Sequence, residues 1–547
     1  MKYEVNEPKI TFVVPVYGTS GIWLPRCLDS LLDNQDYENK SVIVVFDGKN
    51  NQSQKALSQE DEYRDDNQVT FIHLDENKGA PHARNAGLDL VNKRGGSEYI
   101  CFFDCDSMLT AGAIRIWVKA FEDNPECGFV YGGYRFRMDK GQFSYMPAKP
   151  FDRWLLTCNN YISTMNPIKV SICPRWDEDV PSLQDWDFWL RATVDGTIGF
   201  YIRDYLVITE ESDKAENISQ KSHKDWENIY QVIRDKNGIP DRKVAIASIG
   251  AEFQAIRRSK YLGADYRDPQ MLVLKPHHYK AIISMGFYVQ SEYGPYYVFA
   301  RANGSKKIVH FIGTDVLQLQ CLKFLEVKAF SKSIKNSVDK VLCNAPWLKD
   351  ELEEMGVESE LLYCPIESSK YVSKPFPNKF TIAYYYSDSN PLHNWNFIVD
   401  MTLKTPDIEW KFFGGEKKIF KDLPENVELM GRIPEHKIPE FIASTSMILR
   451  ITLHDGFPAS LAEWAMSCRP FVCNIKDMPF GRFVDAFPQK ITNYVKSIER
   501  VYDKIRKVQK ALHRDTEWKE LEIAKKYYGR LLEPEKYKKR MNEICEV

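Results

Sequence analysis

The N-terminal part of the chain alternates short apolar runs with amphipathic segments. The runs are rich in β-branched residues and are not interrupted by polar ones, as expected for strands buried on both faces of a parallel sheet. Amphipathic stretches at 24–34 and 82–91 suit helices that cover such a sheet. The pattern predicts an open α/β domain over 1–212, whose ligands should lie beyond the carboxyl ends of the strands. The predicted strands span 11–17, 41–47, 69–75 and 98–103.

A second α/β series follows a polar stretch. Residues 213–242 are charged and end in a Gly-Ile-Pro breaker, which predicts a helical linker. Apolar runs then recur between 243 and 475, separated by helical segments. We expect two Rossmann-type subdomains, 243–375 and 376–547, facing each other across a cleft. The second should end in a basic helical tail, because 496–540 holds 15 Lys and Arg against 8 Asp and Glu.

Composition and charge narrow the class of protein. The 547 residues exceed the usual size of a single core, and 44% hydrophobic with 27% charged residues is ordinary for a globular protein. The net charge of −2 gives no overall attraction to nucleic acid or acidic membranes. We find no signal-peptide pattern and no apolar run of about 18 residues. We therefore expect a cytoplasmic protein without a transmembrane anchor. Peripheral contact at the inner face of a membrane, and an oligomer, stay open.

An acidic pair follows the strand predicted at 98–103. Asp104 and Asp106 stand two positions apart with a small residue between them. Because side chains alternate along an extended chain, both carboxylates point the same way. Two carboxylates held together repel unless a cation neutralises them, and hard divalent ions prefer carboxylate and phosphate oxygens. The pair predicts a Mn²⁺ or Mg²⁺ site that also holds a nucleotide diphosphate. The competing interpretation is that both residues cap a turn.

Other residues near predicted strand ends suit the same ligand. Pro15 ends the first strand, and Tyr17 offers a ring beside a base. Asp47 follows the second strand and can accept from a base N–H. Gly79 begins a helix that carries Arg84, which can reach a phosphate. Taken singly, Pro15 is also a strand stop, Asp47 a turn residue and Arg84 a surface charge.

In this order the motifs resemble the inverting family 2 glycosyltransferases of GT-A fold. The resemblance covers roughly Pro8–Thr209 and extends to WDEDVPSLQDWDFWLR. By that match Asp185 is the catalytic base, Trp186 shapes the acceptor site, and Asp187 and Arg191 support them. The competing interpretation is an ordinary amphipathic helix whose dipole stabilises Asp185 near its N-terminus.

The resemblance implies one reaction. A carboxylate removes the proton of an acceptor hydroxyl, the metal neutralises the departing nucleoside diphosphate, and single displacement inverts the anomeric centre. UDP is the commonest nucleotide in this family. The acceptor stays open between a glycan, a lipid-linked glycan, a protein and a modified nucleic-acid base.

The second half resembles the family 4 glycosyltransferases of GT-B fold over roughly Lys243–Ile491. The segments that carry this are GTDVLQL, NVELMGRIPEHKIPEFIASTSMILRIT and DGFPASLAEWAMSCRPFVC. In that family two acidic residues separated by seven others contact the donor sugar and ribose, a spacing that Asp455 and Glu463 keep. The competing interpretation of Glu463 is an exposed helix face. The other donor-binding residues implied are Gly313, Gly456, Phe457 and Ser460.

The second half also departs from that family. Where an Arg and a Lys usually bind the pyrophosphate, this chain has DSNPLHNW with His393 alone. Two interpretations stay open: a second transferase with an altered phosphate grip, or a degenerate domain that binds acceptor or assembles oligomers.

Two further function classes compete. A nucleotidyltransferase or dinucleotide-binding oxidoreductase also uses acidic strand ends, but no GxGxxG follows the first strand. A nucleotide- or glycan-binding module without turnover is the non-enzymatic alternative.

Overall fold

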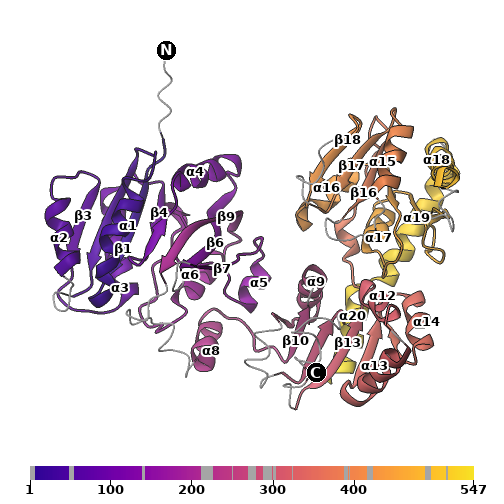
Figure 1. Ribbon diagram of the computed structural model, residues 1–547, viewed down its shortest axis with the longest axis horizontal. Coiled ribbons are helices and arrows are strands. Elements are labelled where there is room, and N and C mark those ends of the chain that lie inside the picture. Colours follow the sequence, from indigo (N-terminus) through magenta and orange to yellow (C-terminus); the bar gives the residue numbers. More distant parts are fainter. Residues whose placement is uncertain are drawn as a thin grey trace. The chain divides into compact units, whose positions relative to one another are not determined.

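The computed structural model divides the chain into two compact units, Met1–Asp241 and Arg242–Val547 (Figure 1). Each unit is described by itself. The structure describes residues 7–48, 54–137, 142–210, 226–248, 251–268, 279–287, 299, 304–322, 324–386, 392, 395–415, 423–486, 494–512 and 515–546.

The first unit is built on a nine-stranded mixed sheet. Its strand order is β3-β2-β1-β4-β8-β6-β9-β5, and β7 pairs with β6 beside this path. The four strands predicted at the N-terminus are β1 to β4, and they are mutually parallel as expected. The later strands differ from the expected open parallel sheet, because β8 is antiparallel to β4 and β6. The strands are β1 Ile10–Val16, β2 Lys40–Phe46, β3 Val69–His73, β4 Tyr99–Phe102, β5 Ser107–Leu109, β6 Cys127–Arg137, β7 Phe143–Met146, β8 Ile168–Lys169 and β9 Ile198–Glu210.

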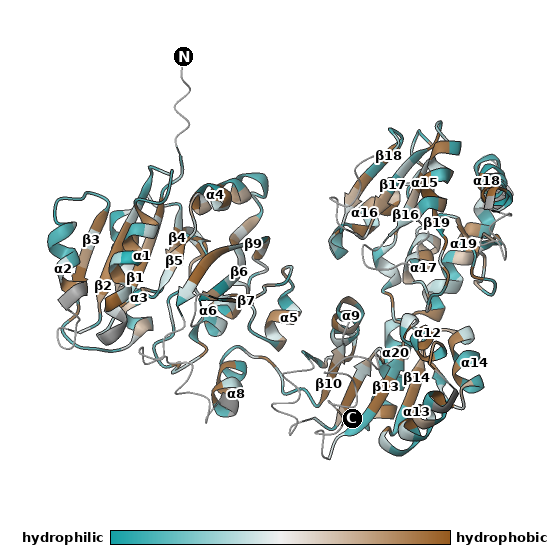
Figure 2. Ribbon diagram, viewed as in Figure 1, coloured by the Kyte–Doolittle hydropathy of each residue, from teal (hydrophilic) through white to brown (hydrophobic). Residues whose placement is uncertain are grey.

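Helices cover both faces of this sheet and bury two apolar clusters. One cluster joins the sheet to α1, α2 and α4, and the other joins it to α3, α5, α6 and α8. Figure 2 shows the apolar strands between helices whose outer faces are hydrophilic. The helices are α1 Leu24–Leu31, α2 Gln54–Glu62, α3 Ala80–Arg94, α4 Ala113–Asp123, α5 Arg153–Cys158, α6 Gln184–Ala192 and α8 Trp226–Lys236.

The segment expected to be a linker contributes a packed helix to the first unit. Ile229 and Ile233 of α8 lie in the cluster that also holds α6. The division between the units falls after Asp241, and residues 211–225 lie outside the described ranges. Residues 226–241 are therefore part of the first unit and not a linker, because the apolar face of α8 is buried there.

The second unit contains two parallel six-stranded sheets, and its division at residue 375 stays a prediction. Their orders are β11-β10-β12-β13-β14-β15 and β18-β17-β16-β19-β20-β21. The strands of the first sheet are β10 Val244–Ser248, β11 Asp265–Arg267, β12 Ala281–Met285, β13 Lys306–Phe311, β14 Lys340–Cys343 and β15 Glu360–Leu361. Those of the second are β16 Thr381–Tyr385, β17 Glu409–Phe413, β18 Val427–Gly431, β19 Met447–Arg450, β20 Phe471–Cys473 and β21 Arg482–Phe483.

The helical tail of the second unit returns to its first sheet. Arg540 of α20 donates to both carboxylate oxygens of Glu360 at 2.6 and 2.8 Å, next to β14. Residues 534–545 therefore pack with the subdomain expected at 243–375 rather than with their sequence neighbours. The helices are α9 Glu252–Leu262, α12 Thr314–Gln320, α13 Phe324–Ser337, α14 Pro346–Glu354, α15 Trp395–Lys404, α16 Ile438–Ala443, α17 Ala459–Met466, α18 Tyr494–Ala511, α19 Asp515–Leu531 and α20 Pro534–Cys545.

No helix in the described ranges is long and apolar enough to span a lipid bilayer.

Candidate active site

The acidic pair lies in the tight turn between β4 and β5. The backbone N–H of Ser107 closes the turn on the carbonyl of Asp104 at 3.0 Å. Burial, and then the negative charge of Asp104, raise the pKa of Asp106 to about 7, although the Ser107 hydroxyl donates to it at 3.3 Å. The fold thus holds Asp104 close enough to disfavour the charged form of Asp106. A divalent cation would relieve this repulsion, so the pair fits the expected metal. The described residues contain no cluster of three or more His, Cys, Asp or Glu around it.

Arg84 of α3 connects this turn to α6. Its guanidinium donates to Asp104 Oδ1 at 2.8 Å and to Gln184 Oε1 at 3.4 Å. It also lies over the Trp176 ring, 4.4 Å from the ring centroid. Arg84 is only 6% exposed, so the interpretation as a surface charge is wrong. A buried, charge-assisted contact of this kind fixes the relative position of the elements that it joins.

Asp185 stands in the first turn of α6. Asn160 donates to its Oδ2 at 2.9 Å, and the backbone N–H of Trp186 donates to its Oδ1 at 3.0 Å. Burial nevertheless raises the pKa of Asp185, and the charge of Asp104 adds to that rise. Burial is also the main reason that the pKa of Tyr134 rises, with contributions from the charges of Asp185 and then Asp104. The three side chains therefore share one electrostatic environment.

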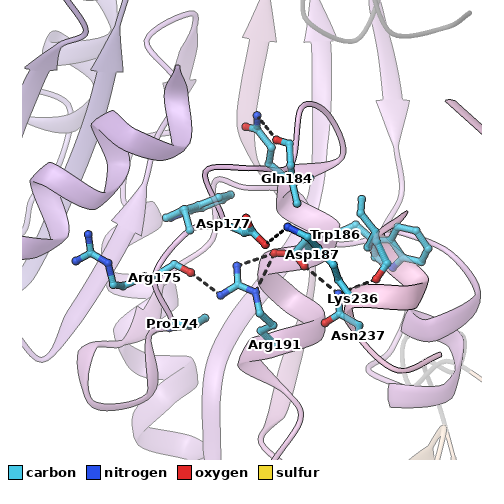
Figure 3. A network of polar contacts seen from close by, with 12 residues as sticks. Pro174, Arg175, Asp177, Gln184, Trp186, Asp187, Arg191, Lys236 and Asn237 are labelled. Carbon is cyan, nitrogen blue, oxygen red and sulfur yellow. Dashed lines mark hydrogen bonds and ion pairs between the residues drawn. The ribbon is translucent and has the colours of Figure 1, made fainter. Parts of the chain in front are cut away.

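A polar network around Asp187 and Arg191 holds α6 in place (Figure 3). Arg191 donates to Asp187 Oδ2 at 2.8 and 2.6 Å, and it also donates to the carbonyl of Arg175. Asn237 donates to the other oxygen of Asp187 at 2.9 Å. The carboxylate of Asp187 is buried and fully engaged, which agrees with a supporting role.

The position of Trp186 differs from the acceptor-side role implied by resemblance. Its ring is 0% exposed, its indole N–H donates to the carbonyl of Leu156 at 2.7 Å, and it stacks on Tyr230 of α8 at 4.4 Å. The physical reason is the apolar face of α8, which covers it. Trp186 is a core residue that anchors α6, and it does not line a surface for an acceptor.

The remaining donor-site residues gather around the loops after β1 and β2. Pro15 lies within β1 opposite Val45, and Tyr17 follows the strand with an exposed ring. The buried Asp47 accepts from the backbone N–H groups of Lys78 at 3.0 Å and Gly79 at 2.8 Å. Gly79 takes φ 95° at the N-cap of α3, a conformation that favours glycine. Asp47 thus positions the start of the helix that carries Arg84.

In the second unit, Asp455 is held within its own loop. Arg450, at the end of β19, donates to Asp455 Oδ2 at 2.9 and 2.6 Å. The indole of Trp347 donates to the Asp455 carbonyl at 2.8 Å. Gly456 packs so closely on the carbonyl of Ile312 that no Cβ fits there.

Glu463 is similarly engaged. Its Oε1 accepts from Arg257 at 3.0 Å and from the Tyr371 hydroxyl at 2.9 Å. Its side chain is largely buried, so the interpretation as an exposed helix face is wrong. Ser460 lies in the first turn of α17. The other donor-binding residues implied by the resemblance lie in the loop after β13 and in the loop before α17, and these two loops contact each other. Gly313 packs against Gly456, and the backbone N–H of Phe457 donates to Asn344 at 3.3 Å. His393 lies outside the described residues.

Sequence reasoning misses four residues of the first site: Tyr134, Asn160, Trp176 and Gln184. Asn160 and Gln184 are polar residues outside the strand ends, and only the fold brings them to Asp185 and Arg84. The available signal is that Trp176 and Gln184 fall within the acidic motif itself.

Comparisons with known proteins relate the first unit to glycosyltransferases. Residues 11–174 match the family model described as glycosyl transferase family 2, which stops short of Asp185. The teichoic acid poly(glycerol phosphate) polymerase of Staphylococcus epidermidis is 29% identical over 195 residues, 34% of this chain and 26% of that protein. An uncharacterised glycosyltransferase of Methanocaldococcus jannaschii is 22% identical over 214 residues, 37% of this chain and 71% of that protein.

Among solved structures, Anabaena HepE in complex with UDP and glucose aligns with a TM-score of 0.45 and 11% identity, over 56% of this chain and 100% of that one. The chain spans only 26% of the length of the polymerase. The family match and the relative named as a glycosyltransferase place a glycosyltransferase domain of family 2 in the first unit of the chain.

Proposed function

We propose that the chain is a metal-dependent, inverting glycosyltransferase that moves a sugar from a nucleotide-sugar, most simply a UDP-sugar, to a hydroxyl acceptor. One contact supports this function most directly. The ion pair between Arg84 and Asp104, at 2.8 Å, joins the acidic turn to the helix that carries Asp185. A candidate base and a candidate metal ligand are thereby held in one electrostatic environment, in which the side chain of Asp104 is 34% exposed.

Asp185 is suited to act as the base. Its pKa is raised by burial, which makes its carboxylate a better proton acceptor than an exposed aspartate. Asn160 and the backbone N–H of Trp186 each donate to one oxygen of the carboxylate, and each oxygen keeps a second lone pair for a substrate. In the reaction the acceptor oxygen bonds to the anomeric carbon, the bond from that carbon to the phosphate oxygen breaks, and the acceptor proton passes to Asp185.

Asp104 and Asp106 are the residues that would hold Mn²⁺ or Mg²⁺. Such an ion supplies Lewis-acid neutralisation of the departing diphosphate. Arg84 holds Asp104 in place and adds a positive charge within reach of the same region. Asp47 accepts from the backbone N–H of Gly79 at the start of α3, and the exposed ring of Tyr17 is the group proposed to contact the base of the nucleotide.

We propose a single transferase activity, with the second unit as a non-transferring domain. Both carboxylates that would contact a donor there, Asp455 and Glu463, are already engaged by Arg450 and Arg257. We favour acceptor binding or assembly for the second unit over a second GT-B transferase site, because the sequence after residues 381–385 also lacks the Arg and Lys that bind the pyrophosphate in family 4. The acceptor itself could be a glycan, a lipid-linked glycan, a protein or a modified base.

Release of UDP from UDP-sugars tests this function. We expect release that depends on Mn²⁺ or Mg²⁺, rises when acceptor is present, and disappears with EDTA while the far-UV circular dichroism stays unchanged. Binding of nucleotide-sugar without any release, across a donor and acceptor panel followed by mass spectrometry, would instead indicate a binding module without turnover.

A further inference from the structure

An exposed patch of aromatic and basic side chains lies on the hairpin formed by β6 and β7. We call it the hairpin platform, and its residues are Arg135, Arg137, Phe143 and Tyr145. In the antiparallel register Arg137 stands opposite Phe143, and Arg135 stands opposite Tyr145. Directly paired residues share one face of a sheet, so all four side chains lie on the same side.

The rings of the platform are ordered although they face solvent. Phe143 is 38% exposed and Tyr145 is 54% exposed. The Arg135 and Arg137 guanidiniums lie 5.4 and 5.8 Å from the centre of the Phe143 ring. The Tyr145 ring packs edge-on against Tyr205 at 5.1 Å. Large apolar rings held at a surface by such contacts are typical of a binding face, since a mobile ring would lose more entropy on binding.

Positive charge exceeds negative charge at this edge of the unit. Arg137 shares Glu210 with Arg26 of α1, at 3.4 and 2.9 Å respectively. With Arg135, three cations therefore stand near two carboxyl groups, since Asp106 of the acidic turn lies beside Glu210. Within the described part of the chain, Nε of Arg135 and both Nε and Nη2 of Arg26 are buried without a hydrogen-bond acceptor. Because these nitrogens are covered, an anionic ligand would pair with the Arg137 guanidinium, whose side chain is 38% exposed.

The platform borders the candidate active site. The backbone N–H of Glu210 donates to the Asp106 carbonyl at 3.2 Å, so the carboxylate shared by the two arginines adjoins the acidic turn. A chain-like acceptor that extends beyond the reacting hydroxyl can therefore reach the platform.

We propose that the hairpin platform binds the acceptor as an anionic sugar chain, with its rings stacked on sugar faces and its arginines paired to phosphate or carboxylate groups. This inference rests on the proposed function, because it names the substrate class of the same site. The exposed rings suit the apolar faces of sugars, and the excess of arginine selects chains that carry negative charge.

Direct binding without donor tests the platform separately from turnover. Calorimetry of the full chain would use a hyaluronan octasaccharide and a phosphomannan oligosaccharide as anionic probes, and a chitin octasaccharide as the neutral probe. We expect at least one anionic probe to bind with an affinity that falls with salt, and the neutral probe to bind at least about tenfold more weakly. Equal binding of the neutral probe, or binding of neither anionic probe, would overturn the proposal.

Variants assign the binding to these residues. We expect Tyr145→Ala and Arg135→Gln each to weaken the anionic probe by about tenfold, and Tyr145→Phe to restore it. Phe253→Ala and Arg64→Gln are matched controls, since both replace exposed residues elsewhere on the chain. Folding is checked by the melting temperature of each variant. Unchanged affinity in folded platform variants would contradict the proposal, as would a concentration-dependent dimer lost in Tyr145→Ala, which would assign the face to a second copy.

Turnover and probe binding are measured separately. If only the platform proposal is wrong, the protein releases UDP but does not bind the anionic probes as expected. If only the proposed function is wrong, the protein binds an anionic probe but releases no UDP.

Discussion

The side chain of Asp185 has the most specific chemical role proposed for this chain. Replacing it by Asn keeps the shape and the contact to Trp186 but removes the proton acceptor. We expect Asp185→Asn to bind UDP-sugar as the parent does and to lose about 10²–10⁴-fold in kcat, the usual contribution of a general base. Asp195→Asn, at an exposed position just beyond the same helix, is the control. Near-parent turnover of Asp185→Asn on an identified acceptor would refute the assignment.

The hydrogen bond from Asn160 predicts a pH effect with a definite sign. A base works only when deprotonated, so activity rises with pH through its pKa. Asn160 stabilises the charged form of Asp185 and lowers the pKa of a group that burial raises. Removing that donor in Asn160→Ala raises this pKa, and the acidic limb of the kcat profile moves to higher pH. Asn124→Ala, whose amide bonds only a local carbonyl, should leave the profile in place. A limb that does not move would exclude Asp185 as the titrating base.

At the residue scale, strand-end residues could be predicted and their partners could not. Asp104, Asp106 and Asp47 follow apolar runs, a pattern visible in the sequence. Asn160 and Tyr134 carry no such local signal. They reach the site because β6 and the segment after α5 fold back to it, and that approach depends on long-range packing.

At the element scale, α8 determines the position of α6. The Tyr230 ring stacks on Trp186 at 4.4 Å, and its hydroxyl donates to the Cys158 carbonyl. Tyr230→Ala opens a cavity beside Trp186, for which we expect a loss of about 2–4 kcal/mol in the free energy of unfolding and a parallel loss of turnover. Val232→Ala on the same helix, at a position 44% exposed, should cost less than about 0.5 kcal/mol. Thermal and urea unfolding measure both, and an unchanged melting temperature in Tyr230→Ala would contradict this role.

The sequence pattern predicts the helix at α8 but not where it belongs. Its charged flanks and the Gly-Ile-Pro breaker are typical of a linker, while Ile229 and Ile233 form an apolar stripe that is explained only once α6 offers a surface for it. The same holds for α20, whose amphipathic pattern does not say that Arg540 will pair with Glu360. Hydrophobic periodicity gives the existence of a helix, and the partner comes from the fold.

The link between α17 and α9 gives a second test at this scale. Glu463→Gln leaves the buried guanidinium of Arg257 without its closest carboxylate. Because Glu435 still lies 3.6 Å from Nε of Arg257, the loss should stay below the about 3–5 kcal/mol that an unpaired buried charge costs. We expect a lower melting temperature for the second unit and unchanged UDP release by the first. Lys349→Gln, which breaks an exposed pair with Glu353, is the control. If Glu463→Gln had the melting temperature of the parent, the ion pair between Arg257 and Glu463 would not stabilise the contact between α9 and α17.

At the scale of the whole molecule, the two units should separate by function. The boundary after Asp241 divides a family 2 domain from two parallel sheets whose candidate carboxylates are already paired. A fragment of residues 242–547 should therefore show no rise in melting temperature with a panel of UDP-, GDP- and dTDP-sugars, because Arg450 and Arg257 occupy the groups that a donor would need. The full chain, tested with the same panel, should be stabilised by its own donor through the first unit, with the shift growing with ligand concentration. Stabilisation of the fragment that Asp455→Asn removes would reverse this conclusion, since it would mean that a donor can displace Arg450 and that the second unit holds a working nucleotide-sugar site.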